Sequence, residues 1–282
     1  MKRKPEWLRI QSKSNPNIAL VEELISNSNL NTVCAEANCP NYNECFSKKI
    51  ATFMILGKNC TRNCNFCNVS HEIPEQISAD EPKNLARAVS ALGLKYVVIT
   101  SVTRDDLADG GAEHFAKVIQ AVRKNCHETA IEVLIPDFKG ELKALRTVAG
   151  ASPDVISHNV ETVPELYAAV RQQAKYCRSL ELLRNIKLIN PKIHSKSGIM
   201  LGMGETKEQV LKLFEDLRKA DCDFITIGQY LAPTAKHYPI YEFITPKQFE
   251  EYGSIAKKMG FSFVASAPLV RSSYNASEAL AT

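Results

Sequence analysis

The sequence YVVITSVTRDDLADGGAEHFAKVIQAV, at residues 96–122, joins a strand pattern to a helix pattern. It opens with a continuous apolar, β-branched run, which predicts a strand buried on both faces. After a polar turn with two glycines, apolar residues recur at helical spacing at Phe115, Val118, Ile119 and Val122. A buried strand followed by an amphipathic helix indicates one βα unit of a parallel sheet.

The same alternation extends in both directions along the chain. Six apolar runs are strand candidates, at 51–57, 96–102, 130–137, 155–161, 196–202 and 224–231. Further helical faces lie between them, at Leu85, Ala88, Val89 and Leu92, at Val210, Leu213, Phe214 and Leu217, and in a last helix near 246–259. Six βα units predict an α/β fold that is either a closed or partial barrel or a doubly wound open sheet. In both architectures the site lies at the carboxyl ends of the strands.

Composition restricts the classes of partner. The chain has 282 residues and a net charge of +4, from 35 Lys and Arg against 31 Asp and Glu, which is too small an excess to indicate a nucleic-acid partner. No apolar run approaches the roughly 20 residues that span a bilayer, which predicts no membrane partner. The first 17 residues contain no apolar core of a secretory signal, so we expect a cytoplasmic protein.

Cysteines are crowded into one part of the chain. There are nine, and six of them fall between Cys34 and Cys67. Disulfides are rare in reducing compartments, so this crowding favours metal or cluster binding. Cys60, Cys64 and Cys67 have the spacing C-x3-C-x2-C directly after the first predicted strand. Three thiolates on one tight loop can hold three irons of a 4Fe–4S cluster and leave the fourth open to a methionine-type cofactor.

A second triad has the spacing C-x4-C-x5-C, at Cys34, Cys39 and Cys45. It suggests a second cluster that also lacks one protein ligand. The isolated Cys126, Cys177 and Cys222 are expected to act as small apolar side chains.

The cysteines alone leave two alternatives open. One is a zinc site, with His71 four residues past Cys67. The other is a ferredoxin-like electron carrier without catalysis.

Phe66, just before the last cysteine of the C-x3-C-x2-C loop, makes this loop resemble the signature of the radical SAM (S-adenosylmethionine) superfamily. With the second triad, the chain resembles the lipoyl synthase family from residue 5 to residue 275. The other matching segments are ATFMILG (51–57), YVVITSVTRDDLADGGAEHF (96–115), SHNVETV (157–163), KSGIMLGMGE (196–205), GQYLAPT (228–234) and R-S-S-Y (271–274).

The resemblance implies a partial TIM-type (β/α)6 barrel at 51–260. Residues 1–50 would form an extension with the auxiliary-cluster cysteines, and residues 261–282 a second extension with the R-S-S-Y motif. Ser273 is then expected to bind the fourth iron of the auxiliary cluster, and Arg271 to orient the loop. Because serine oxygen is a harder ligand than thiolate, its bond to iron should be the easiest to release.

The implied activity is that of a sulfurtransferase in lipoate biosynthesis. It inserts two sulfur atoms at carbons 6 and 8 of a protein-bound octanoyl-lysine, using SAM and sulfur from the auxiliary cluster. The cofactors are two 4Fe–4S clusters, with SAM as cosubstrate. The alternative within the superfamily is a biotin-synthase-like or methylthiotransferase-like enzyme, which should lack the second triad paired with R-S-S-Y.

The expected partners follow from the same resemblance. They are an octanoylated lipoyl carrier domain or glycine cleavage H protein, an electron donor such as a flavodoxin or ferredoxin, and an iron–sulfur assembly or carrier protein.

SAM contacts are expected near the strand ends. Asn159 and Glu161 are candidates for the ribose or amino group, and Lys196 for the carboxylate. The full set is Phe66, Thr100, Ser101, Asn159, Glu161, Lys196, Gly202, Gly204, Glu205, Gln229 and Leu231. We expect His158 to be a hydrogen-bonded core residue. The stretch 104–106, Arg-Asp-Asp, is equally consistent with a helix entrance or a substrate-contacting loop.

Overall fold

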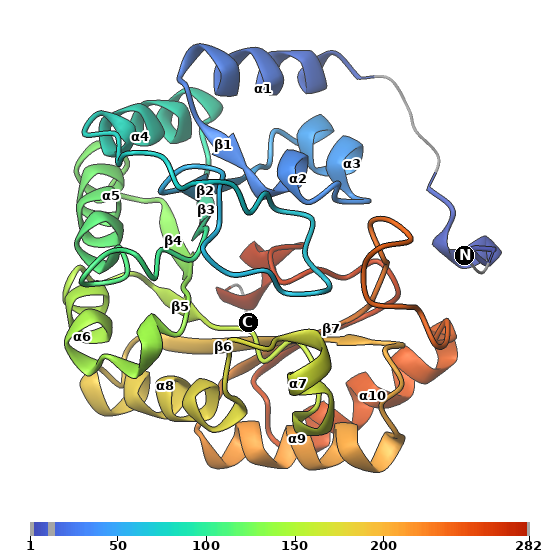
Figure 1. Cartoon of the computed structure of the whole chain (residues 1–282). Coiled ribbons are helices and arrows are strands. Elements are labelled where there is room, and N and C mark those ends of the chain that lie inside the picture. The colour runs from blue at the N-terminus through green and yellow to red at the C-terminus, as the bar shows by residue number, and fades with distance from the viewer. Residues whose placement is uncertain (1–2, 11–14, 281–282) are drawn as a thin grey trace. The chain divides into compact units, whose positions relative to one another are not determined.

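A computed structural model describes residues 3–10 and 15–280, and the chain divides into two compact units. The N-terminal unit comprises residues 15–62 and 68–156, and the C-terminal unit comprises residues 3–10, 63–67 and 157–280. Figure 1 follows the chain by colour from blue to red.

The N-terminal unit begins with short elements and continues as strand–helix alternation. Its elements are α1 (Pro16–Asn27), β1 (Asn31–Thr32), α2 (Val33–Glu36), α3 (Tyr42–Ser47), β2 (Thr52–Ile55), α4 (Glu81–Leu92), β3 (Tyr96–Ser101), α5 (Ala112–Asn125), β4 (Ala130–Leu134), η2 (Phe138–Gly140), α6 (Leu142–Gly150) and β5 (Val155–Ser157), which ends at the boundary. Strand β1 pairs antiparallel with β2, whereas β2, β3 and β4 pair in parallel. Helices α4, α5 and α6 lie side by side (Figure 1).

The C-terminal unit continues the alternation. Its elements are η1 (Glu6–Leu8), η3 (Pro164–Leu166), α7 (Tyr167–Val170), α8 (Tyr176–Ile189), β6 (His194–Leu201), α9 (Lys207–Lys219), β7 (Phe224–Gln229), α10 (Pro246–Lys258), β8 (Phe263–Ser266) and η4 (Ala276–Leu280). Strands β6, β7 and β8 are parallel, with Ile199 opposite Ile227 and Ile225 opposite Val264. The backbone beyond β5 runs beside β6, because the amides of His158 and Glu161 donate to the carbonyls of Lys196 and Gly198 (both 2.9 Å).

Helices α9 and α10 begin at residues whose side chains cap the helix N-terminus. Helix α9 opens with a capping box between Thr206 and Gln209, and α10 opens with one between Thr245 and Gln248. These reciprocal side-chain bonds satisfy backbone N–H groups that have no partner within the helix. The apolar faces predicted for α4, α5 and α9 are buried. The predicted helices and the α/β alternation are confirmed.

All six predicted strands are present, but most are shorter than the apolar runs that predicted them. The run at 51–57 ends as a strand at Ile55, because Leu56 (φ 69°) and Gly57 (φ 90°) turn into left-handed backbone. The run at 155–161 ends at Ser157, and Glu161 is also left-handed (φ 66°). Apolar residues therefore continue beyond the hydrogen-bonded part of each strand, into loops where residues such as Leu56 and Val160 are also buried.

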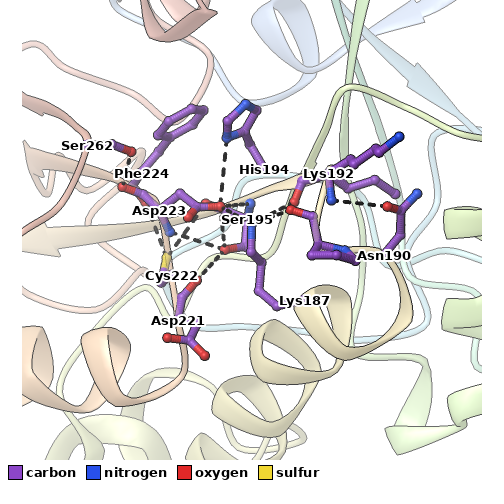
Figure 2. Close-up of polar contacts among 12 residues, drawn as sticks. Lys187, Asn190, Lys192, His194, Ser195, Asp221, Cys222, Asp223, Phe224 and Ser262 are labelled. Carbon is purple, nitrogen blue, oxygen red and sulfur yellow. Dashed lines mark hydrogen bonds and ion pairs between the residues drawn. The ribbon is translucent and has the colours of Figure 1, made fainter.

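The amino ends of β6 and β7 are joined by a polar network around Asp223 (Figure 2). Its Oδ2 accepts hydrogen bonds from Lys187 Nζ (2.8 Å), Ser195 N (2.8 Å) and Ser195 Oγ (3.2 Å). The Asp223 carbonyl accepts from Ser262 N (2.9 Å) and Ser262 Oγ (3.1 Å). One aspartate thus ties α8, β6 and the segment before β8 to β7.

No helix in the described ranges, 3–10 and 15–280, has the length and apolar character needed to cross a membrane.

Candidate active site

The first cysteine loop follows β2, as the sequence predicts. Cys60 belongs to the N-terminal unit, and Cys64 and Cys67 belong to the C-terminal unit. All three side chains are partly exposed, and the nine cysteines form no disulfide. The thiols are therefore accessible in the folded chain.

Cys60 is held in a setting that suits a thiolate ligand. Its Sγ accepts backbone N–H bonds from Arg62 (3.4 Å) and Thr103 (3.3 Å), and its own N–H donates to the Ser70 carbonyl (2.7 Å). Hydrogen bonds donated to sulfur stabilise negative charge there, and such bonds accompany iron–sulfur ligation. The surroundings of Cys60 therefore fit a cluster ligand.

The other half of the loop is fixed within the C-terminal unit. The Asn65 amide donates to the Val170 carbonyl (3.0 Å), and the Asn65 carbonyl accepts from Tyr238 N (2.8 Å). His237 Nε2 lies 3.1 Å from the Cys67 carbonyl oxygen. Phe66 packs against a buried apolar cluster of Val170, Met203 and Tyr230. The aromatic residue of the motif thus anchors the loop to this core.

The segment from the end of β5 to the residue that follows α7 contains several buried polar atoms without partners. Among the described residues, six buried side-chain N or O atoms have no hydrogen bond. Four of these belong to this part of the C-terminal unit: Ser157 Oγ, Asn159 Oδ1, Thr162 Oγ1 and Arg171 Nε. Each buried, unsatisfied polar group costs about 1–3 kcal/mol. Such a group of unpaired atoms indicates a site that a polar ligand would complete.

Arg171 is a residue of this site that the sequence reasoning missed. Its Nη1 donates to the carbonyls of Asn159 (2.9 Å) and Val160 (3.2 Å), and the guanidinium lies over the Tyr167 ring (5.5 Å). Burial opposes its charge, but Tyr167, Glu161 and the nearby Cys64 raise the pKa of the guanidinium. A cation is therefore maintained beside Cys64. The sequence signal was faint, because Arg171 follows no strand directly.

Glu161 is the acidic residue that interacts electrostatically with this cation. Burial raises the pKa of its carboxyl, while the charge of Arg171 and a hydrogen bond from Asn159 lower it. The predicted pair Asn159 and Glu161 therefore lies together with Arg171 in one unit.

Strand β6 approaches this pair closely at Gly198. A Cβ on Gly198 would lie 2.7 Å from Thr226 Oγ1 and 2.9 Å from Asn159 Oδ1, so only glycine allows this close approach to the amide oxygen. The predicted Lys196 is fully buried in the same strand. Gly198 is a second residue that the sequence reasoning missed.

The side chains of two predicted SAM contacts, Glu205 and Gln229, form hydrogen bonds with nearby backbone groups. The Glu205 carboxylate accepts N–H bonds from Gly202 (2.5 Å) and Met203 (2.9 Å), which closes the turn after β6. Burial raises the pKa of Glu205, although these bonds favour the charged form. Gln229 Nε2 donates to the carbonyls of Leu201 (3.0 Å) and Glu242 (3.1 Å).

The remaining predicted contacts lie at other strand ends. Gly204 adopts φ 107° in the turn after β6, and Leu231 is partly buried after β7. In the N-terminal unit, Thr100 Oγ1 donates to the Leu134 carbonyl (3.1 Å), whereas Ser101 Oγ is buried without a partner. His158 Nε2 lies 2.9 Å from Ser179 Oγ, which supports the expected structural role.

The second cysteine triad lies within the N-terminal unit. Cys34 is on α2, Cys45 is on α3, and Cys39 is in the turn between them. Burial raises the pKa of Cys34 to about 11 and that of Cys45 to about 12. The charges of Cys34 and Cys39 raise the pKa of Cys45 further, so the three sulfurs are close enough to repel one another as thiolates. Bound iron would reverse this repulsion, so the donor set fits a cationic centre.

In the part of the chain that the structure describes, no three His, Cys, Asp or Glu side chains are arranged around a point where a single metal ion would bind. In a 4Fe–4S cluster each cysteine binds a different iron, so this centre does not require such convergence.

The R-S-S-Y segment belongs to the C-terminal unit and is partly buried. The Tyr274 amide donates to the Arg271 carbonyl (3.0 Å), and Arg271 Nη1 donates to the Val270 carbonyl (2.7 Å). A Cβ on Gly228 of β7 would clash with the Val270 carbonyl. The segment that leads to Ser273 therefore packs directly against the backbone of β7.

Comparison with known proteins defines the class. Residues 54–217 match the family model of the radical SAM superfamily. This match covers more than half of the chain, so the protein is a radical SAM enzyme, of the class that uses a 4Fe–4S cluster and SAM.

Similar sequences define the family. The lipoyl synthase of Alkaliphilus metalliredigens is 58% identical over 280 residues, which cover 99% of this chain and 97% of that protein. The lipoyl synthase of Caldicellulosiruptor bescii is 57% identical over 274 residues, which cover 97% and 94% of the two chains. The chain belongs to the lipoyl synthase family. It is therefore an enzyme of lipoate biosynthesis, and the alternatives of an electron carrier and a zinc module are set aside.

Solved structures support the fold. The [FeFe]-hydrogenase maturase HydG has a TM-score of 0.59 at 10% identity, over 92% of this chain and 62% of HydG. Methylornithine synthase (PylB) has a TM-score of 0.54 at 16% identity, over 95% of this chain and 82% of that one. At such low identity the likeness concerns the fold alone, and the predicted partial barrel is confirmed.

Proposed function

We propose that this chain inserts two sulfur atoms, at carbons 6 and 8, into an octanoyl group in amide linkage to a lysine of a carrier protein. SAM is the cosubstrate, and an auxiliary 4Fe–4S cluster is the sulfur source. The observation that carries the proposal is the second cysteine triad, Cys34, Cys39 and Cys45, all three of which belong to the N-terminal unit of a radical SAM enzyme. Family membership at 58% identity to a lipoyl synthase supports the same reaction.

The chain offers two donor sets for two centres. Cys60, Cys64 and Cys67 would hold the cluster that faces SAM. The auxiliary centre would take Cys34, Cys39 and Cys45, with Ser273 as the oxygen ligand of its fourth iron. When bound, these centres supply an electron for cleavage of SAM to a 5′-deoxyadenosyl radical and sulfide for the new C–S bonds.

The proposed chemistry needs no side-chain acid, base or nucleophile at the reacting carbons. The reacting carbons carry unactivated C–H bonds, which no protein nucleophile attacks, so a radical must remove the hydrogen. The residues around β5 and β6 then have the tasks of binding and orienting SAM. The unpaired Asn159 Oδ1 and Arg171 Nε suit its polar methionine portion, because one accepts and the other donates a hydrogen bond.

The partners are part of the proposal. The substrate would be an octanoylated lipoyl carrier domain or glycine cleavage H protein. A flavodoxin or ferredoxin would deliver electrons, and an iron–sulfur assembly or carrier protein would restore the consumed cluster. All of these reactions are consistent with a cytoplasmic enzyme, and the extensions at 1–50 and 261–282 would complete the auxiliary centre.

A direct assay tests this function. Anaerobically reconstituted protein, with about eight irons per chain, would be incubated with SAM, a chemical reductant and an octanoyl-lysyl peptide. We expect 5′-deoxyadenosine together with a peptide whose mass has increased by two sulfur atoms as the dithiol, or by two sulfur atoms less two hydrogens as the cyclic disulfide. Formation of 5′-deoxyadenosine without sulfur in the peptide would instead indicate another radical SAM chemistry.

A further inference from the structure

A buried ionic network surrounds Arg62, which lies between Cys60 and Cys64 in the first cysteine loop. Its Nε and Nη2 donate to the two carboxylate oxygens of Asp105 (2.7 and 3.0 Å), and Nη2 also donates to Asp137 Oδ1 (2.6 Å). The side chains of Arg62 and Asp137 are 6% and 0% exposed. One guanidinium is thus enclosed by two carboxylates within the N-terminal unit.

The network reaches the Cys60 sulfur through the backbone. Arg62 N donates to Cys60 Sγ (3.4 Å), and so does Thr103 N (3.3 Å). Thr61 Oγ1 donates to the Thr103 carbonyl (2.9 Å) and accepts from Asp105 N (3.0 Å). Residues 60–62 are therefore hydrogen-bonded to Thr103 and Asp105, and the side chain of Arg62 restrains the residue whose amide donates to the sulfur.

We propose that Arg62, Asp105 and Asp137 form a positioning clamp that holds the Cys60 sulfur in the orientation that its iron requires. This proposal rests on the proposed role of Cys60 as a cluster ligand. The three clamp side chains act through the backbone and are positioning residues. Partners that orient a ligand typically change metal affinity by about 10- to 100-fold.

Fold stability alone does not account for this arrangement. Replacing a buried ion pair by apolar residues of similar volume is often neutral or stabilising. A planar guanidinium held by both oxygens of one carboxylate has a fixed orientation. Fixed orientation of this kind is what a neighbouring metal ligand requires.

A neighbouring pair provides a matched comparison. Arg104 Nε and Nη2 donate to the carboxylate of Asp106 (2.9 and 2.8 Å), and Arg104 is also buried. Its Nη1 donates to the Leu56 carbonyl (3.1 Å), which precedes the cysteine loop. Both arginines are buried and hold one carboxylate through Nε and Nη2, but the Asp106 side chain is more exposed than Asp105 and Asp137, and no hydrogen bond joins the Arg104 guanidinium to residues 60–62 of the described chain.

The test compares Arg62→Lys with Arg104→Lys in the full chain. Both proteins would carry alanine in place of the auxiliary cysteines Cys34, Cys39 and Cys45, so that all bound iron reports the first cluster. Lysine retains the positive charge but loses the planar fork. After anaerobic reconstitution, we expect Arg62→Lys to release iron to a chelator about 10- to 100-fold faster than the parent. Arg104→Lys should stay within about twofold of it.

A second pair of variants covers the case in which Arg62→Lys does not fold, as judged by circular dichroism. Asp105→Asn should accelerate iron release, and Asp106→Asn should not. Equal release from the clamp variants and the parent would overturn the clamp, and so would equal acceleration in the clamp and control variants. A parent protein that holds no iron would overturn the proposed cluster itself, and the clamp with it.

Discussion

Replacement of Arg171 by lysine tests the SAM site proposed for the residues after β5. Arg171 Nη1 already binds the carbonyls of Asn159 and Val160, whereas its Nε is buried and has no partner. Lysine keeps the cation beside Glu161 but lacks a second donor in a fixed plane. We therefore expect Arg171→Lys to weaken SAM binding without leaving an unpaired buried carboxylate.

The magnitude follows from the unpaired Nε. A hydrogen bond to a charged group contributes about 1.5–3 kcal/mol net. Each tenfold change in Kd corresponds to about 1.4 kcal/mol. Loss of one such bond to the polar methionine portion of SAM therefore raises the Kd for SAM about 10- to 150-fold.

Equilibrium dialysis of labelled SAM against the anaerobic holoenzyme would measure this Kd, with the cluster oxidised so that SAM is not cleaved. Arg184→Lys is a suitable control, because Arg184 is exposed on α8. Circular dichroism would show that both variants are folded. A folded Arg171→Lys protein with a Kd within about twofold of the wild type would refute the assignment of Nε to SAM.

Three further predictions concern the clusters, the sheet and the site. Ser273→Ala should still cleave SAM, as measured by chromatography of 5′-deoxyadenosine, but lipoyl formation should be impaired or abolished. Cys60→Ala should abolish both reactions. Equal losses in the two variants would argue against separate roles for the two residues. Asp223→Asn should lower the free energy of unfolding in urea by about 1–3 kcal/mol, because Oδ2 loses its charge. Asp221→Asn, at an exposed side chain, should change it by less than about 0.5 kcal/mol, and similar effects of the two changes would contradict the network. Gly198→Ala should destabilise the protein by about 1–3 kcal/mol and raise the Kd for SAM, because its methyl group would crowd Asn159; unchanged values of both would remove Gly198 from the site.

The sequence predicts the βα framework well, because burial on two faces and helical periodicity are local signals. The strand at Tyr96–Ser101 and the buried face of α5 follow from one quoted segment. The two-residue strand β1 (Asn31–Thr32) is too short to produce a period, so nothing in the sequence indicates it.

Candidate site residues that lie close together in the sequence were identified, whereas residues that only folding brings together were missed. The three cysteines of each triad lie within twelve residues of one another, so their spacing is visible. Arg62 and Asp137, in contrast, are separated by 75 positions and meet only because the loops after β2 and β4, the strands on either side of β3, converge. The sequence did not indicate that Arg171 belongs to the candidate site, because most of its hydrogen-bond partners are backbone carbonyls.

The Asp223 network also has a practical meaning for protein engineering. It lies at the amino ends of β6 and β7, whereas Asn159, Glu161 and the turn at 202–205 lie past the carboxyl ends of β5 and β6. In barrels of this kind the first end serves stability and the second serves chemistry. Variants intended to increase heat resistance are best sought around residues 187–195, 221–223 and 262, where new packing or charge pairs can be introduced at a distance from the residues that would handle SAM.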